Sequence, residues 1–81
     1  MPTVLRVRGF RFAFFSADWD EPPHVHASKA GCMAKFWLEP VQLAGNFGFA
    51  RRELGEIDQI VREHERDLLS RWHEYFGQYL G

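Results

Sequence analysis

Cysteine is almost absent from this chain of 81 residues, and the single thiol of Cys32 cannot form an internal disulfide bond. One cysteine in a short chain is typical of a protein from a reducing compartment. No apolar run approaches the roughly 18 to 20 residues that a membrane-spanning helix needs, and no charged-then-apolar leader opens the chain. We therefore expect a cytoplasmic protein without a membrane partner.

An excess of either charge is also lacking, because the formal net charge is only −1. The distribution behind that total is uneven. Residues 1–15 contain three arginines and no acid, whereas residues 16–23 contain Asp18, Asp20 and Glu21 and no base. The N-terminal segment therefore predicts a local basic surface on a nearly neutral protein.

Aromatic residues, by contrast, are abundant: eight Phe, three Trp and two Tyr make up 16% of the chain. The length allows one domain, residues 1–81, which buries only about 60 to 65% of its unfolded surface and is stabilised by a partner or a homodimer. A core of this size needs few aromatic rings. We therefore expect some of the aromatic residues on a surface that contacts another molecule. The partner-binding candidates are Trp19, Trp37, Phe47 and Phe49.

The first segment, residues 3–15, predicts a β-hairpin with its turn at Arg8 and Gly9. A two-residue turn places Arg6 directly opposite Arg11 and gathers on the other, core-facing side Leu5, Val7, Phe10, Phe12 and Phe14. Like charges in opposed positions are destabilising unless an acid or an anion lies between them. The two arginines are therefore candidate anion ligands, although salt bridges to Asp18, Asp20 or Glu39 would also explain them.

The motif Glu21-Pro22-Pro23-His24-Val25-His26 is the most informative stretch of the sequence. The two prolines disfavour helix, and in an extended strand the imidazoles of His24 and His26 point to the same face. A histidine pair on one face can shuttle protons, hold a metal or bind a phosphate. This motif marks the expected site.

These histidines begin a second predicted hairpin, with strands at 24–27 and 33–38 joined through residues 29–31. Its register stays open. A two-residue loop at 29 and 30 places Lys35 opposite His24, whereas a three-residue loop places Phe36 there and turns Lys35 to the other face.

After Pro40, which is expected to end the sheet, residues 41–44 suggest a helical turn and residues 45–49 a loop with exposed aromatics. From residue 51 apolar residues recur at three and four, which predicts helices over 51–64 and 67–79 with a bend near Glu65. The expected fold class is α+β: β-hairpins over residues 1–39 form a small antiparallel sheet, and the helical region, residues 51–79, packs on one face.

Three chemistries compete at the expected site. In metal-independent RNA cleavage, His24 and His26 act as the acid–base pair, because imidazole titrates near cellular pH, and Arg6, Arg11 and Lys35 hold phosphate. In a metal site, the two histidines are completed by Asp18, Asp20, Glu21 or Cys32; this reading is weaker, because the spacing shows no further ligands and the arginines would repel a cation. In the third, the sheet binds RNA, DNA or a protein without catalysis.

Several motifs together resemble a family of short prokaryotic proteins known as a domain of unknown function, numbered four-one-six-zero. They are MPTVLR, GFRF, EPPHVH and AKFWLEP, and the resemblance continues to Trp72. Genes of this family typically lie beside another short gene, and such pairs have been proposed as toxin–antitoxin modules. The resemblance thus implies a toxin-like component and an antitoxin-like protein partner.

The residues and the resemblance together favour RNA binding or cleavage at His24 and His26 without metal or cofactor. Whether the protein is an enzyme, a metal-independent ribonuclease, stays open. The alternative is a non-catalytic interaction or regulatory module that docks a partner encoded nearby.

Overall fold

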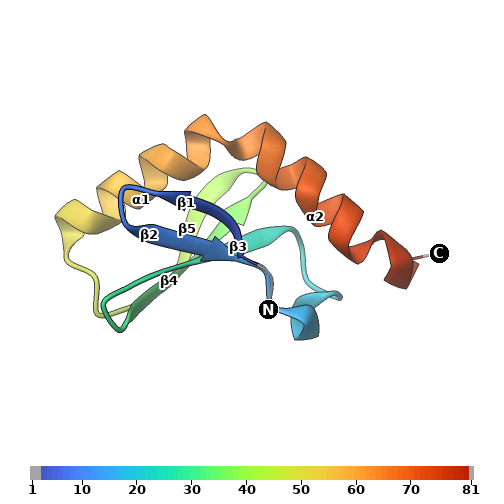
Figure 1. Ribbon diagram of the computed structural model, residues 1–81, viewed down its shortest axis with the longest axis horizontal. Helices are drawn as coiled ribbons and strands as arrows, with labels where there is room; N and C mark the ends of the chain where they lie inside the picture. Colours follow the sequence, from blue (N-terminus) through green and yellow to red (C-terminus); the bar gives the residue numbers. More distant parts are fainter. Residues whose placement is uncertain (1–2, 81) are drawn as a thin grey trace.

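The structure is a computed structural model that describes residues 3–80, without the side chains of residues 18 and 78–80. Five antiparallel strands follow one another in the sheet in chain order, and two helices complete the chain (Figure 1). The elements are β1 (Thr3–Val7), β2 (Phe10–Ala13), the 3₁₀ turn η1 (Ser16–Asp18), β3 (His24–Lys29), β4 (Cys32–Leu38), β5 (Val41–Phe47), α1 (Arg51–Glu63) and α2 (Glu65–Leu80). The expected α+β class is confirmed.

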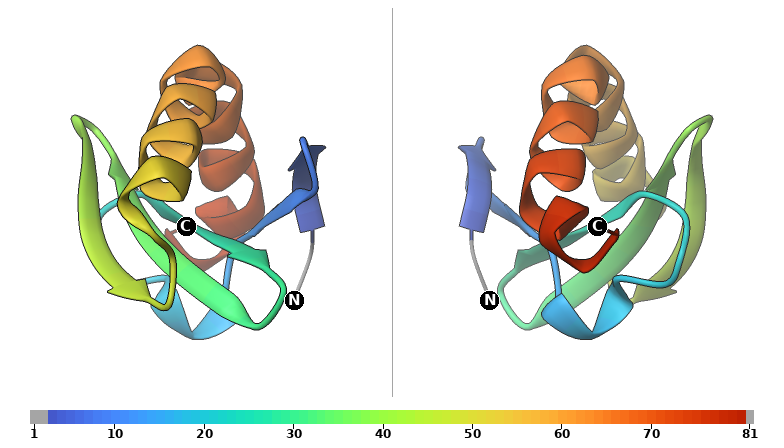
Figure 2. Two further views of the ribbon diagram at one scale, coloured as in Figure 1. Left: turned by 90° about the vertical axis from the view of Figure 1, so that its left-hand side faces the viewer. Right: turned by 90° about the vertical axis from the view of Figure 1, so that its right-hand side faces the viewer.

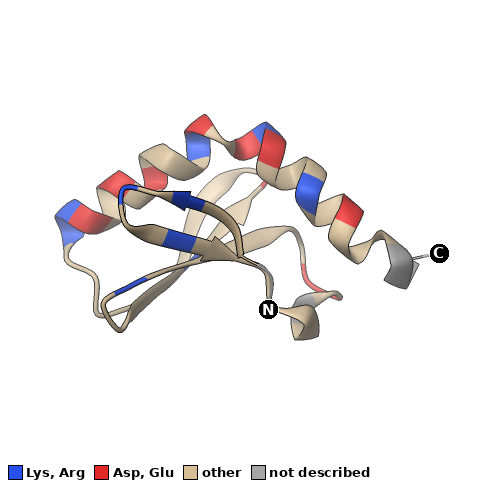
Figure 3. Cartoon of the chain, in the orientation of Figure 1, with Lys and Arg blue, Asp and Glu red and all other residues tan. Residues whose placement is uncertain are grey.

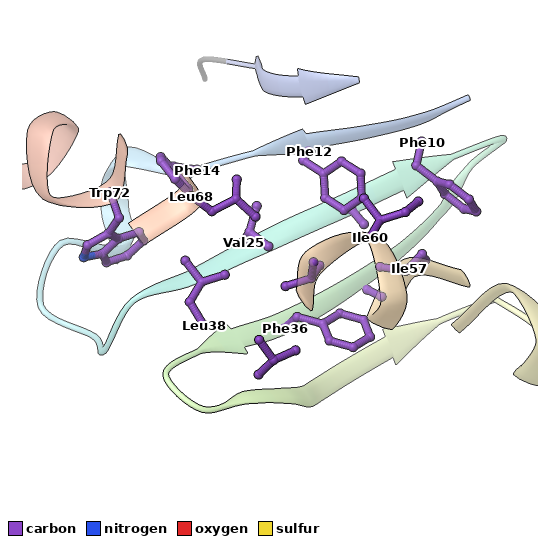
Figure 4. Packing of buried hydrophobic residues seen from close by; sticks show 14 of the residues in the cluster. Phe10, Phe12, Phe14, Val25, Phe36, Leu38, Ile57, Ile60, Leu68 and Trp72 are labelled. Carbon is purple, nitrogen blue, oxygen red and sulfur yellow. The ribbon is translucent and has the colours of Figure 1, made fainter. Parts of the chain in front are cut away.

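Both helices lie over the same face of a curved sheet (Figure 2). The core between the layers is apolar and strongly aromatic, as expected from alternate strand residues meeting one stripe of each helix (Figure 4). Its members include Phe10, Phe12, Phe14, Val25, Phe36 and Leu38 from the strand region, and Ile57, Ile60, Leu68, Trp72 and Phe76 from the helices. Within residues 3–80, neither α1 nor α2 covers the opposite face of the sheet (Figure 2).

The first hairpin has the predicted register. Val7 pairs with Phe10, and Arg6 pairs with Arg11. The turn residues Arg8 and Gly9 have φ values of 53° and 83°, the left-handed conformation that a tight hairpin turn requires. The phenylalanines of β2 enter the core, so the two arginines lie on the other face.

Neither register considered for the second hairpin is right. The turn is formed by Ala30 and Gly31, again with positive φ, and it extends both strands beyond their predicted bounds. His26 consequently pairs with Lys35, and His24 pairs with Trp37. Lys35 therefore shares a face with both histidines, which the three-residue loop would have prevented.

The prediction that the sheet ends at Pro40 is wrong. Glu39 and Pro40, joined by a cis peptide bond, form a turn, and the segment expected to be a helical turn and loop is the edge strand β5. Phe49, expected to be exposed, is only 6% exposed and packs edge-on against Phe10. Asn46 explains this inward course, because its side-chain amide bonds both the N–H and the carbonyl of Phe49.

The two predicted helices and the bend between them are confirmed. α1 ends at Glu63, and His64 adopts non-helical backbone angles before α2 begins at Glu65. The His64 ring is satisfied locally, with Nδ1 2.8 Å from the carbonyl oxygen of Ile60. Within residues 3–80 neither helix is long and apolar enough to cross a membrane.

Candidate functional site

The sheet face turned away from the helices, here called the outer face, brings together most of the predicted site residues. Strand alternation and the pairing register place on it Arg6, Arg11, His26, Ser28, Lys35, Trp37 and Phe47. Basic residues of β1 and β2 stand out on this part of the chain, whereas both signs of charge alternate along the helices (Figure 3). The outer face is therefore a local basic surface, as the charge distribution predicted.

Arg6 and Arg11 face one another across β1 and β2. Among the residues that the structure describes, neither forms an ion pair with a carboxylate. The Nε atom of Arg11 is buried and has no hydrogen-bond partner within this described part. A buried N–H of a guanidinium without an acceptor is costly. An anion bound between the two arginines would offset the repulsion of their charges and accept hydrogen bonds from their outer N–H groups.

On β3, His26 is the next outward-facing residue after Ser28, which pairs with Arg11. His26 itself pairs with Ala13 of β2 and with Lys35 of β4. Its ring stacks on Phe15, with centroids 3.9 Å apart and planes 9° from parallel. The imidazole is partly buried rather than enclosed. Phe15 thus fixes the plane of the ring, whose Nδ1 is buried.

His24 differs from His26, because its side chain is 0% exposed. Nδ1 lies 3.0 Å from the carbonyl oxygen of Pro22, which favours the tautomer that donates from this nitrogen. Trp37 and Trp72 contact the same ring, with centroids 5.6 and 5.0 Å away. His24 and His26 do meet, at a centroid distance of 5.2 Å, but His24 acts here as a packed anchor for the Pro-Pro turn.

Glu21 connects this turn to the outer face. Its Oε1 accepts a hydrogen bond from Lys35 Nζ at 2.6 Å and lies 3.8 Å from His24 Nδ1. The Lys35 ammonium also sits over the Trp37 ring, 4.6 Å from its centroid. Lys35, predicted to hold phosphate, is thus already paired with a carboxylate.

A hollow of about 520 Å³ lies on the other side of the turn, between the turn and α2. It is lined by Trp19, Asp20, Glu21, Pro22, Pro23, Trp72, His73 and Phe76. Its surface is mostly carbon with two carboxylates and one imidazole. The predicted partner-binding residue Trp19 is 48% exposed here.

The other predicted aromatic contacts fall in different places. Phe47 is 75% exposed at the sheet edge, Trp37 is partly buried beside His24, and Phe49 belongs to the core. Sequence reasoning missed Phe15 and the bridging role of Glu21. Phe15 follows the outward-facing alternation of Arg11 and Ala13, which was a usable signal, but the contacts of Glu21 depend on a loop path that no periodicity encodes.

The metal alternative gains no ligand cluster. Within the described residues, no three His, Cys, Asp or Glu side chains come together as a metal site. The side chain of Asp18, one of the ligands considered, lies outside the described residues. Cys32 lies at the far end of the second hairpin, paired with Lys29.

These features define a small α+β domain whose sheet is covered by helices on one face and bears basic and aromatic residues on the other. The sequence matches the family described as Domain of unknown function (DUF4160) over residues 9–73. The chain belongs to this family, as the motifs led us to expect. No curated protein and no solved structure matches it.

Proposed function

We propose that this protein binds RNA on the outer face of its sheet, as the toxin-like component of a two-gene module. The toxin role follows from the family resemblance, and RNA binding follows from the surface. The observation that carries it is the pair of opposed arginines without an acidic partner among the described residues, one of them with a buried and unsatisfied Nε. Guanidinium groups bind phosphate through paired, charge-assisted hydrogen bonds, as they also bind carboxylate.

Aromatic rings on the same face as the arginines support RNA as the source of that phosphate. Phe47 is exposed in the same cross-strand row as Arg6 and Arg11, at the opposite edge of the sheet. His26 lies in the next outward-facing row, and Trp37 lies in the row after that. Single-stranded nucleic acids are bound by surfaces that combine backbone-neutralising cations with rings on which bases stack. An open sheet face with both components fits a short single-stranded segment.

The geometry supports binding better than cleavage by two histidines. A general acid or base must reach the proton that it transfers, within hydrogen-bond distance or through one water. His26 comes nearer to this requirement, because the residue is only partly buried, although its Nδ1 is buried; His24 is enclosed by Pro22, Trp37 and Trp72. If cleavage occurs, we assign His26 to contact the ribose and His24 to position the turn.

The test is binding of a fluorescent single-stranded oligoribonucleotide, followed by anisotropy at low salt. Arg6→Ala and Arg11→Ala should each weaken binding about 10- to 100-fold, because a hydrogen bond to a charged group contributes about 1.5–3 kcal/mol. Arg52→Ala, an exposed arginine on α1, is the matched control and should change affinity little. Equal effects of all three variants, or no binding by the wild type, would refute the proposal.

Growth after tightly induced expression tests the toxin role separately. Arrest by the wild type that is relieved by Arg11→Ala and His26→Ala, at equal protein level, supports a toxin acting through the outer face. Absence of arrest, or arrest indifferent to both substitutions, contradicts it. His24→Ala is informative only together with a folding check, since it also opens a cavity.

A second candidate is a non-catalytic module that docks a protein encoded nearby. The exposure of Trp19 beside the hollow favours it, because large aromatic residues dominate the energetics of protein interfaces. Trp19→Ala would then abolish the complex with that partner, while Arg11→Ala would leave it intact. A protein complex that survives Trp19→Ala would contradict this second candidate.

A further inference from the structure

The two edges of the sheet are protected to very different degrees. Sheet edges expose unpaired backbone N–H and C=O groups, and natural proteins guard them with charged residues, proline or β-bulges. β1 carries Arg6 and is followed by Arg8. β5 is longer, and its sequence VQLAGNF contains neither a charge nor a proline.

β5 also presents apolar side chains along this uncharged edge, whose protection is one bulge at Ala44. Leu43 is 44% exposed and Phe47 is 75% exposed, and Gln42 and Ala44 are exposed too. No helix lies beyond β5 at its margin of the sheet (Figure 2). One contact covers its beginning, where Arg62 Nη2 donates to the Val41 carbonyl at 3.2 Å. The edge from Gln42 onward is therefore available to another strand.

We propose that β5 pairs with β5 of a second copy of this chain, so that two five-stranded sheets become one continuous antiparallel sheet. Charge selects this occupant among the possible edge pairings. Two copies of β1 would bring their arginines together, and β1 against β5 would leave a free edge at each end and build open filaments. Pairing β5 with itself opposes no like charges and closes with two-fold symmetry.

The two-fold symmetry of this dimer constrains which residues of the two β5 strands pair with each other. When two antiparallel copies of β5 overlap over their full length, the central residue of each lies beside its counterpart, and Ala44 is the central residue of β5. A register shift between Lys35 and Phe36 of β4 occurs opposite this residue, so the bend of the bulge falls on the symmetry axis and the two paired strands must follow the same bend. The outer faces of the two copies then lie on the same side of the joined sheet, and Phe47 lies beside the dimer interface.

The experiment is the solution mass by light scattering and sedimentation, from micromolar to millimolar protein. The wild type should approach twice the 9.5 kDa of one chain. Ala44→Lys and Leu43→Lys each place two ammonium groups across the axis and should weaken dimerisation about 100-fold or more. Gln59→Lys adds the same charge on an exposed position of α1 and should leave the mass unchanged.

Hydrogen exchange of the wild type provides a second measurement that needs no variant. Backbone amides of residues 42–46 should become protected as concentration rises, while those of β1 should not. A mass of 9.5 kDa at millimolar concentration, a dimer indifferent to both lysine substitutions, or concentration-independent exchange of β5 would overturn the proposal. RNA binding is measured on the same samples, so failure of one proposal is distinguished from failure of the other.

Discussion

At the scale of single residues, Glu21 joins segments that the sequence keeps fourteen residues apart. Its carboxylate bonds Lys35 on β4 and approaches His24 at the start of β3. Both members of the ion pair remain accessible, with side chains 38% and 27% exposed, so water screens their attraction. The pair therefore matters more for where Lys35 points than for the stability of the fold.

Glu21→Gln tests that distinction. We expect a loss of less than about 1 kcal/mol in the free energy of unfolding, because exposed ion pairs contribute little. RNA affinity should rise, since the Lys35 ammonium is released to a phosphate. Urea unfolding and oligonucleotide anisotropy measure the two effects, and Asp58→Asn, which breaks the exposed pair with Arg62, is the control. Weaker RNA binding by Glu21→Gln would show that the carboxylate itself supports the site.

Ala30 holds a backbone conformation that suits it poorly. Its φ is 50°, in the left-handed region where an alanine Cβ is unfavourable, and Gly31 follows with φ 82°. Asn followed by Gly is the preferred pair for this kind of turn. Ala30→Asn should raise the free energy of unfolding by about 1 kcal/mol, measured by urea denaturation. Ala17→Asn, at an exposed position without positive φ, should not stabilise, and equal effects would contradict the explanation.

At the scale of elements, α1 begins without a side-chain cap. Its N-cap residue is Ala50, whose methyl group cannot accept a hydrogen bond, although Glu53 already bonds the Ala50 N–H at 3.1 Å. Ala50→Ser would complete the reciprocal capping box and should stabilise the protein by about 1 kcal/mol. Thermal unfolding measures this gain. Ala50→Val suits the extended backbone but provides no acceptor, so a similar gain from valine would refute the capping argument.

Elements were predictable where one local signal sufficed. Arg8 and Gly9 between alternating apolar runs fixed the first hairpin, and the apolar stripe from residue 51 fixed both helices. The second hairpin was misread because an alanine occupies a left-handed position that sequence rules reserve for Gly or Asn. β5 was missed because its uncharged sequence lacks alternation and follows a proline, features that normally argue against a strand.

The candidate site was predictable in location but not in detail. Alternation placed Arg6 and Arg11 on one face and brought both histidines together, and the structure has these arrangements. The burial of His24 depends on Trp72, which lies forty-eight residues later and reaches it only through the packing of α2. Long-range contacts of this kind leave no periodic trace in a sequence.

At the scale of the whole molecule, the basic outer face belongs to a chain with net charge −1. Long-range attraction of RNA is therefore small, and binding should depend on a few close phosphate contacts. We predict that the logarithm of the association constant falls with the logarithm of salt concentration at a slope of about 1.4, or about 0.7 for each arginine contact to single-stranded RNA.

Anisotropy titrations over a series of salt concentrations measure that slope. Arg11→Ala should lower it by about 0.7, and Arg52→Ala should leave it unchanged. A slope near zero for the wild type would mean that the contacts are not ionic. A decrease with Arg52→Ala as large as with Arg11→Ala would mean that general surface charge, rather than the outer face, attracts RNA.

All three tryptophans of the chain surround the turn that carries the histidine motif. Trp37 and Trp72 contact His24, and Trp19 lines the hollow beside Trp72. Indole emission changes in wavelength and intensity with the polarity around the ring and with nearby quenching groups. The protein therefore contains its own optical probe of this region, and an unlabelled sample excited near the red edge of its absorption will report any ligand or partner that moves the turn.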